Sequence, residues 1–356
     1  MKRLLVFNLA VDVDDPILGF TTVWINRLAE HFSHVDVITM RSGRLAVADN
    51  VRVWSVGKER GYNEPRRLLI FYTTLLMLLL TRRYAACFAH MMPLFALLAA
   101  PLLVLFGVPQ TLWYTHRQSH RVLRWATRVV RRAVTAASDS FPVATPKLRV
   151  IGHGIDTEVF SPGSAALAHP SEIAQVARLM PIKNQRTLIR ALGRLHDRAA
   201  RAVFVGGVPP EQSRRYAEEL ERLAQEVGVG SRVQFCGDRN RADVVAQLRG
   251  SAVAVNLSPP GLFDKAALES IACAVPTVVS SAAFASLLGE HDARLRIDDP
   301  EDDAALADRL DALLSIQVEE RRALGMQLRE RVVAAHGLDG LIERLVAILL
   351  SGEIGA

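Results

Sequence analysis

The chain has 356 residues, 50% of them hydrophobic, and a formal net charge of +6. This length exceeds one ordinary core and suits two domains of about 150 to 200 residues. The positive charge favours anionic partners, such as nucleotide phosphates, acidic lipid surfaces or nucleic acid, without choosing among them. Cys87, Cys236 and Cys273 show neither metal-ligand spacing nor a close pair, so we predict no zinc site, and their pattern fits a reducing compartment.

The first half of the chain alternates predicted strands and helices. Residues 3–10 predict a strand and not a signal peptide, because acidic residues follow without a small-residue cleavage site. A helix is expected over 21–32 and a strand over 35–40. Residues 66–83 predict a helix that is too short to span a bilayer and is either buried or interfacial.

Residues 84–115 carry no formal charge and are long enough to cross a bilayer. However, Pro93, Pro101, Gly107 and Pro109 divide this stretch into short pieces. We therefore expect a strand, a helix and a strand that are buried in a parallel sheet.

A basic amphipathic helix is predicted to begin near residue 122. Apolar side chains recur at the spacing of one helix face, and arginines fall on the other face. The apolar residues are Val122, Trp125, Ala126, Val129 and Ala133. The arginines are Arg121, Arg124, Arg128, Arg131 and Arg132. Such a helix either lies on an anionic membrane, chiefly through Arg121, Arg124, Arg128 and Arg131, or is a surface helix with a solvated face.

The alternation of strands and helices starts again after a linker rich in Ser, Gly, Pro and Ala. We expect an α/β fold of two doubly wound Rossmann-like domains that face a cleft, with the ligand at the carboxyl ends of the strands. The expected segments are an N-terminal domain over 1–155, the linker over 156–170, a C-terminal domain over 171–335, and a helix over 336–356 that returns to the first domain.

Two cations flank the first strand-to-helix connection of the second half. Arg178 follows an apolar strand and Lys183 precedes a helix. Cations in these places can converge on a diphosphate, which the helix N-terminus also favours; taken alone, they fit a surface loop with two solvated cations better. Gly152 and Gly154 allow a tight turn, but Thr157 occupies the place of the third glycine of a dinucleotide fingerprint, which weighs against NAD.

Four ordered motifs resemble the GT-B nucleotide-sugar glycosyltransferases of the GT4 group. They are GHGID with a following Phe and Pro, ARL with KN, VFVGG, and LESIACAVPTVVS. The resemblance implies transfer of a sugar from a nucleoside diphosphate sugar to a glycan, lipid-linked or small-molecule acceptor, with retention of configuration and without a metal or another cofactor. It also implies that Arg178 and Lys183 bind the donor diphosphate and that Glu269 binds the nucleotide ribose, as a carboxylate can by accepting from two hydroxyls.

The stretch GLFDKAALES departs from this family. A second Glu usually precedes the ribose Glu by eight residues, and here Gly261 stands in its place. That Glu handles the transferred sugar, and of the residues around it only Phe263 keeps its type. Asp264 and Lys265 either contact the sugar and the phosphate, or form an ordinary helix start in which Asp264 is the cap and Lys265 is solvated.

The N-terminal domain, which the resemblance makes the acceptor side, offers further candidates. His116 follows a strand at its carboxyl end, where the family often places a His near the donor sugar, and a structural role is the alternative. Gly19 lets the backbone approach the ligand. Asp12 and Asp14 superficially resemble a metal-binding pair of another glycosyltransferase fold, but we expect no metal. We thus predict His116 and Asp264 as catalytic, with Gly19, Gly261, Phe263 and Lys265 as donor-loop candidates.

Other classes stay open at this point. A catalytically weak or inactive nucleotide-sugar binder would keep Arg178, Lys183 and Glu269, and the replacement at Gly261 motivates it. A GT-B epimerase or phosphorylase would use water or phosphate in place of the acceptor. A membrane-only interaction protein would not need the phosphate-binding set. We expect a cytoplasmic protein that is at most peripheral on the inner face of the membrane and does not bind nucleic acid.

Overall fold

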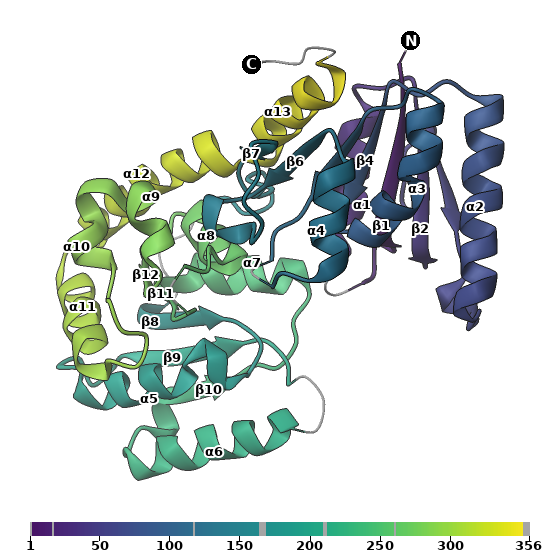
Figure 1. The fold of residues 1–356 in the computed structure, drawn as a ribbon. Helices are drawn as coiled ribbons and strands as arrows, with labels where there is room; N and C mark the ends of the chain where they lie inside the picture. Colours follow the sequence, from purple (N-terminus) through teal and green to yellow (C-terminus); the bar gives the residue numbers. More distant parts are fainter. Residues whose placement is uncertain are drawn as a thin grey trace. The chain divides into compact units, whose positions relative to one another are not determined.

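The structure is a computed structural model that describes residues 2–15, 18–116, 118–163, 169–208, 212–259 and 261–351. It consists of two compact units, Met1–Gly154 with Leu338–Ala356, and Ile155–Gly337. Each unit is built on one sheet with helices on its faces (Figure 1). Part of the expected linker, residues 164–168, lies outside the described residues.

The first unit contains a seven-stranded sheet in the order β3-β2-β1-β4-β5-β6-β7. Every neighbouring pair is parallel. Apolar runs form the central strands because helices cover both faces of the sheet. The strands are β1 (Arg3–Val11), β2 (His34–Ser42), β3 (Val51–Ser55), β4 (Ala86–His90), β5 (Gln110–Trp113), β6 (Arg132–Thr135) and β7 (Leu148–Val150).

Two groups of helices cover this sheet. One face packs against α2 (Glu64–Thr81), α3 (Pro93–Leu105) and α4 (Arg121–Val129). The other packs against α1 (Phe20–Ala29) and α13 (Leu338–Leu350). The predicted strand, helix and strand over 84–115 are confirmed as β4, α3 and β5. Among the described residues, no helix combines the length and the apolar character needed to cross a bilayer.

The helix predicted near residue 122 is confirmed, but its extent and its two faces were predicted wrongly. It ends at Val129, and Arg132 and Ala133 belong to β6 instead, because they pair with β5. Its buried residues are Leu123, Ala126 and Thr127. Trp125 is exposed and shares the outer surface with the arginines, because the face of α4 that packs on the core is the one that carries Leu123 and Ala126.

The second unit contains a five-stranded parallel sheet in the order β10-β9-β8-β11-β12. Its strands are β8 (His169–Val176), β9 (Arg201–Val205), β10 (Val233–Phe235), β11 (Ser251–Asn256) and β12 (Thr277–Val279). Its helices are α5 (Gln185–Arg194), α6 (Gln212–Glu226), α7 (Arg241–Gly250), α8 (Lys265–Ala272), α9 (Ala285–Leu288), α10 (Asp292–Leu295), α11 (Asp303–Ser315) and α12 (Val318–His336). The two parallel sheets with their helices confirm the expected pair of doubly wound α/β folds (Figure 1).

Candidate functional site

The strand order of the second sheet reverses between β8 and β11. From β8, the chain adds β9 and β10 on one side, and β11 and β12 lie on the other side. Open α/β sheets bind ligands at such a point, outside the carboxyl ends of the strands. The connection after β8 carries Arg178 and Lys183, and the connection after β11 carries Gly261 and Asp264. The fold therefore gathers the predicted donor-binding residues of this unit at one sheet edge.

Lys183 links these two connections. It ends the short 3-10 helix η3 (Pro181–Lys183), and its Nζ donates to Ser258 Oγ at 3.0 Å and to the carboxylate of Asp264. Ser258 Oγ donates to the same carboxylate at 2.6 Å. The side chains of Lys183 and Asp264 are only 19% and 15% exposed. The lysine is thus held in a half-buried ion pair and not in solvent.

Asp264 also caps α8, because its Oδ1 accepts from the backbone N of Ala266 at 3.2 Å. Burial alone would raise the pKa of its carboxyl, but the charge of Lys183 and the hydrogen bonds from Lys183 and Ser258 outweigh burial, so the pKa of Asp264 is lowered. The group is therefore ionised at neutral pH and only accepts hydrogen bonds. The structure shows the capping role, and a contact with a sugar stays a prediction.

Arg178 is a free cation at this edge. Its side chain is exposed and makes no hydrogen bond or ion pair with any residue that the structure describes. Its backbone is fixed, because Gln185 Nε2 donates to Arg178 O at 2.9 Å and Leu179 N donates to Gly207 O at 3.0 Å. Gln185 is fully buried and accepts from Tyr216 OH at 3.1 Å. A guanidinium on a fixed backbone is suited to receive an anion.

The N-terminus of α5 follows the two cations closely in the chain. Asn184, in the left-handed region at φ 52°, precedes the helix, and its Nδ2 donates to Leu257 O at 2.9 Å across the two connections. Gln175 Nε2 braces the same turn by donating to Lys183 O at 2.7 Å. The first turn of α5 carries no acidic residue and no side-chain cap. Its partial positive charge therefore adds to that of the two cations.

Glu269 lies on α8, one turn after Lys265. Its Oε1 is 3.4 Å from Lys265 Nζ, and its side chain is 17% exposed. Burial raises the pKa of Glu269, while the charges of Lys265 and Arg241 lower it less. Arg241 itself pairs with Asp156, at 3.1 Å between Nη2 and Oδ2. Lys265 thus forms an ion pair with Glu269. The alternative in which Lys265 is solvated at the helix start does not describe this contact.

The connection after β11 contains two residues of special geometry. Gly261 has φ 75°, in the left-handed region, where a Glu would be strained. Phe263 is 5% exposed and packs against Phe284 and His336, with ring centroids 4.4 and 4.9 Å apart. Phe263 therefore anchors the connection in the core.

Two glycines after β9 permit a close approach to the connection that carries Arg178. A Cβ at Gly206 would lie 2.2 Å from Ala177 O, and one at Gly207 would lie 1.9 Å from the carboxylate of Asp238. Neither position therefore accepts a side chain without displacement of its neighbour. The backbone contact with Ala177 explains Gly206 of the VFVGG motif, whereas the neighbour of Gly207 is a side chain that can move.

The candidates of the first unit follow β1 and β5. His116 is exposed, and its Nδ1 accepts from Gln118 N at 3.1 Å, so the neutral ring carries its proton on Nε2. Gly19 precedes α1, and a Cβ there would lie 2.7 Å from Asp15 O. Its own loop therefore requires this glycine, whatever its relation to a ligand.

Acidic residues of the first loop accept hydrogen bonds from the loop itself and from Arg44. Asp14 receives two hydrogen bonds from Arg44, both at 2.6 Å. Asp12 Oδ1 accepts from the backbone N of Asp14 and of Arg44, each at 3.1 Å. Over the described ranges, no cluster of three or more His, Cys, Asp or Glu side chains could hold a metal.

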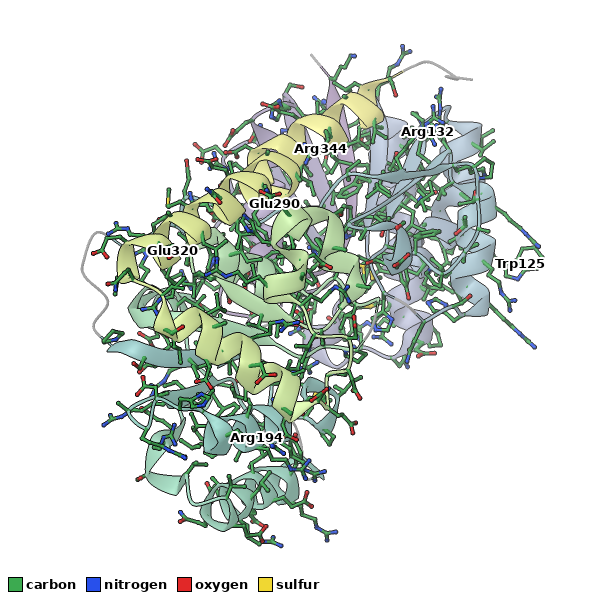
Figure 2. The ribbon with its side chains drawn as sticks, turned by 90° about the vertical axis from the view of Figure 1, so that its left-hand side faces the viewer. Trp125, Arg132, Arg194, Glu290, Glu320 and Arg344 are labelled. Carbon is green, nitrogen blue, oxygen red and sulfur yellow. The ribbon has the colours of Figure 1, made fainter. Side chains whose placement is uncertain are left out.

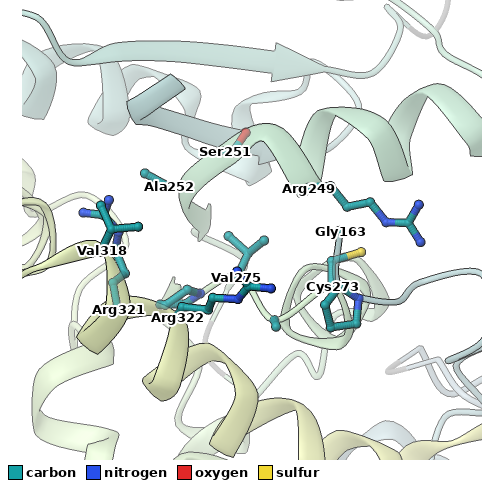
Figure 3. A pocket seen from close by; sticks show the side chains of 12 residues that line it. Gly163, Arg249, Ser251, Ala252, Cys273, Val275, Val318, Arg321 and Arg322 are labelled. Atoms are coloured by element: carbon teal, nitrogen blue, oxygen red, sulfur yellow. The ribbon is translucent and has the colours of Figure 1, made fainter. Parts of the chain in front are cut away.

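A cavity of about 80 Å³ in the same unit is unrelated to this edge (Figure 3). It lies at the amino ends of the strands, beside Ser251, with Arg249 and Arg322 on opposite sides of Val275 in Figure 3. Arg249 Nε donates to Ser161 O at 2.7 Å. A second lining arginine, Arg321, donates to Leu313 O at 3.1 Å and Pro170 O at 3.0 Å. These hydrogen bonds satisfy backbone carbonyls near a helix end and a linker.

Several residues of the candidate site escaped the sequence analysis. Ser258, Asn184, Gln185 and Arg241 make contacts that depend on segments distant in the chain. Two of them had a local signal. Asn184 directly follows Lys183 before a helix, and Ser258 follows an apolar strand at its carboxyl end.

Known proteins resemble this chain in sequence and in fold. Residues 170–315 match the family model for "Glycosyl transferases group 1". A D-inositol 3-phosphate glycosyltransferase of Mycobacterium sp. (strain KMS) is 31% identical over 143 residues, 38% of this chain and 32% of that protein. The matched segment thus spans about a third of the relative's length. The enzyme of the same name from Mycobacterium tuberculosis (strain F11) is 29% identical over 143 residues, 38% of this chain and 29% of that protein.

The solved structures extend the likeness to the whole chain. HepE of Anabaena in complex with UDP has a TM-score of 0.77 at 17% identity, covering 99% of this chain and 100% of that one. Sucrose-phosphate synthase of Thermosynechococcus elongatus has a TM-score of 0.75 at 16% identity, covering 98% of each chain. At such identities the likeness shows the fold, which is GT-B. The resemblance to GT-B glycosyltransferases that the motifs predicted is confirmed, whereas membership of the GT4 group stays a prediction.

Proposed function

Because this chain has the GT-B fold and its residues 170–315 are a group 1 glycosyltransferase domain, we propose that it transfers a sugar from a nucleoside diphosphate sugar to an acceptor hydroxyl. We propose retention of configuration and no requirement for a metal or another cofactor. The observation that carries the proposal is the charge arrangement at the β8 and β11 edge, where Arg178, Lys183 and the α5 N-terminus offer positive charge and Glu269 offers a carboxylate.

The diphosphate is the group that this arrangement suits best. Negative charge builds on the departing diphosphate during transfer, and fixed cations stabilise it. Arg178 is free to donate two parallel hydrogen bonds. Lys183 gives hydrogen bonds to Ser258 and Asp264, and an ammonium has a third proton that remains for a phosphate oxygen. The complexes of HepE with UDP and with UDP-glucose support a nucleoside diphosphate sugar as the donor class.

Asp264 acts in this proposal mainly by positioning Lys183. Its carboxylate accepts from Lys183, Ser258 and Ala266, and a carboxylate has about four acceptor positions. Asn256 is a fourth donor to this carboxylate, so a sugar hydroxyl would bind Asp264 by replacing one of these donors, and would take over part of the role of the Glu that Gly261 replaces. Glu269 accepts the ribose hydroxyls, and His116, from the first unit, acts on the transferred sugar.

A binder with little or no transfer is the second candidate, because Gly261 removes the carboxylate that usually handles the sugar. The acceptor class stays open among glycan, lipid-linked and small molecules. We also propose that Arg121, Arg124 and Arg128 of α4, which are exposed, contact an anionic membrane surface. Arg131 lies beyond the end of that helix.

A screen of nucleotide sugars tests the donor. A donor at one hundred times its dissociation constant should add about 2.7 kcal/mol to the free energy of unfolding, measured as a rise in the unfolding temperature. Nucleoside diphosphates should stabilise more than monophosphates. Release of the nucleoside diphosphate in the presence of acceptor extracts separates a transferase from a binder. Absence of stabilisation by every nucleoside diphosphate tested would contradict the proposal.

A further inference from the structure

The outer helical layer of the first unit belongs to a segment with only one sign of charge. Residues 65–138 contain ten arginines and no Lys, Asp or Glu. This segment includes α2 from its second residue, α3 and α4, which pack on the same face of the seven-stranded sheet (Figure 1). A broad surface of one sign attracts an extended partner of opposite charge.

Large apolar side chains are exposed on the same three helices. Leu69 and Leu80 of α2 are 64% and 67% exposed, Leu105 of α3 is 77% exposed, and Trp125 of α4 is 54% exposed. Figure 2 shows Trp125 at the outer edge of its unit. Single exposed apolar residues are ordinary, but a group of them marks an interaction surface. Further exposed members are Leu68, Leu76, Met77, Leu94, Val104, Phe106 and Val129.

These side chains lie on neighbouring elements. Tyr72 OH of α2 donates to Leu98 O of α3 at 3.2 Å. Leu80 and Phe106 line a common hollow of about 620 Å³ with Arg83. Helix α4 packs against α3. We call the exposed residues of α2, α3 and α4, together with Arg83 and Phe106, the α2–α4 surface.

Several cations of this surface lack a carboxylate partner. Arg83, Arg121 and Arg124 are exposed and form no ion pair with the residues that the structure describes. Arg128 stacks on Trp125, with 4.7 Å between Cζ and the ring centroid. Arg82, by contrast, is neutralised by the buried Asp36. The exposed arginines therefore keep their charge for an outside partner.

We propose that the α2–α4 surface docks on an anionic lipid bilayer. Leu69, Leu80, Leu105 and Trp125 enter the boundary between head groups and acyl chains, where an amphipathic ring also fits. Arg83, Arg121 and Arg124 bind lipid phosphates at the rim. A second copy of the chain fits less well, because a two-fold contact would face this arginine surface with itself. The inference extends the membrane contact proposed for the arginines of α4 to a surface of three helices, and it does not depend on the donor site.

Vesicle flotation of the full chain tests the docking. The wild type should bind phosphatidylcholine vesicles that contain phosphatidylglycerol and should bind phosphatidylcholine alone weakly. A variant with Arg83→Gln, Arg121→Gln and Arg124→Gln should bind about a hundredfold more weakly, near fivefold per arginine. A variant with Leu80→Ser and Leu105→Ser should lose about tenfold or more. Circular dichroism and the unfolding temperature confirm that each variant folds.

Matched controls come from the second unit. Arg322 is exposed and without an ion pair to described residues, and Val333 is 41% exposed, so Arg322→Gln and Val333→Ser should leave binding unchanged. Equal binding to both vesicle types, or unchanged binding by both surface variants, would overturn the proposal. A wild-type dimer in sedimentation that the leucine variant abolishes, without vesicle binding, would instead assign the surface to a second copy. None of these outcomes depends on nucleotide binding.

Discussion

We call the carboxyl ends of β8 and β11, with the connections that follow them, the donor edge. The cations of the donor edge and those of the α2–α4 surface are held in opposite ways. At the donor edge, Lys183 pairs with Asp264, and Lys265 lies 3.4 Å from Glu269. On the α2–α4 surface, Arg121 faces no acidic residue among those described and shares its helix with exposed apolar groups. Paired charges hold a fixed geometry for a small ligand, whereas unpaired charges over a wide area suit a partner with many mobile charges.

Arg178 is the exception within the donor edge. Its side chain is exposed, and it has no carboxylate partner among the described residues. Lys183 and Asp264 together are close to neutral, so the net charge that an incoming diphosphate meets comes largely from Arg178 and the α5 N-terminus. The comparison therefore separates Lys183, a cation whose position is fixed by an ion pair before the ligand arrives, from Arg178, which forms its first charged contact with the ligand.

Removal of Lys183 should have the largest effect, because it breaks the paired arrangement. Lys183→Ala would leave the largely buried Asp264 charged and without its cation, and the free energy of unfolding should fall by about 1 to 3 kcal/mol. Transfer should slow by about a hundredfold to a thousandfold. Urea unfolding measures the first effect and a donor-release assay the second. The double variant with Asp264→Ala should regain part of the stability but not the transfer, and unchanged stability in the single variant would argue against the pair.

Replacement of Glu269 should have a smaller effect. Stability at neutral pH should stay equal or increase, whereas nucleotide binding should weaken. The pKa of Glu269 is raised by burial, so the folded chain holds this proton more tightly than the unfolded chain. The contribution of Glu269 to stability therefore increases as the pH falls from the folded pKa toward the ordinary value, and it is unfavourable at neutral pH. Glu269→Gln should remove this slope and leave stability at neutral pH equal or higher.

Nucleotide binding by Glu269→Gln should weaken by about 1 kcal/mol, or fivefold, because a charge-assisted acceptor is lost. Calorimetry at neutral pH measures the affinity, and urea unfolding as a function of pH measures the slope. Lys265→Gln is the control, since it removes the partner of Glu269 and leaves the carboxylate. A variant that binds as tightly as the wild type would remove Glu269 from the ribose role.

The sequence predicted strands and helices correctly where nearby proline and glycine residues mark their boundaries. Proline and glycine cut residues 84–115 into β4, α3 and β5 as expected. The end of α4 was predicted wrongly because the helical spacing of apolar residues continues to Ala133. In the structure, Arg132 and Ala133 belong to β6 and pair with β5. Trp125 was placed on the wrong face, because periodicity shows which side is apolar but not which side is covered.

Individual residues of the donor edge were named from the sequence, but the ion pair between Lys183 and Asp264 was not predicted. Lys183 and Asp264 are 81 residues apart in the chain, and only the strand order places their connections side by side. The role of Ser258 depends on the same contact. Spacing within one segment cannot supply such pairs, so the sequence indicated a solvated Lys265 and a free Lys183 as alternatives that the structure does not have.

The most direct test of the account is a calorimetric titration of the wild type and Arg178→Ala with a nucleoside diphosphate and the matching monophosphate. We expect Arg178→Ala to bind the diphosphate more weakly by about 1 to 3 kcal/mol and to keep its unfolding free energy within about 0.5 kcal/mol of the wild type. The wild type should prefer the diphosphate, and the variant should lose most of that preference. An equal affinity of both proteins for the diphosphate would contradict the assignment of the β8 and β11 edge as the donor site.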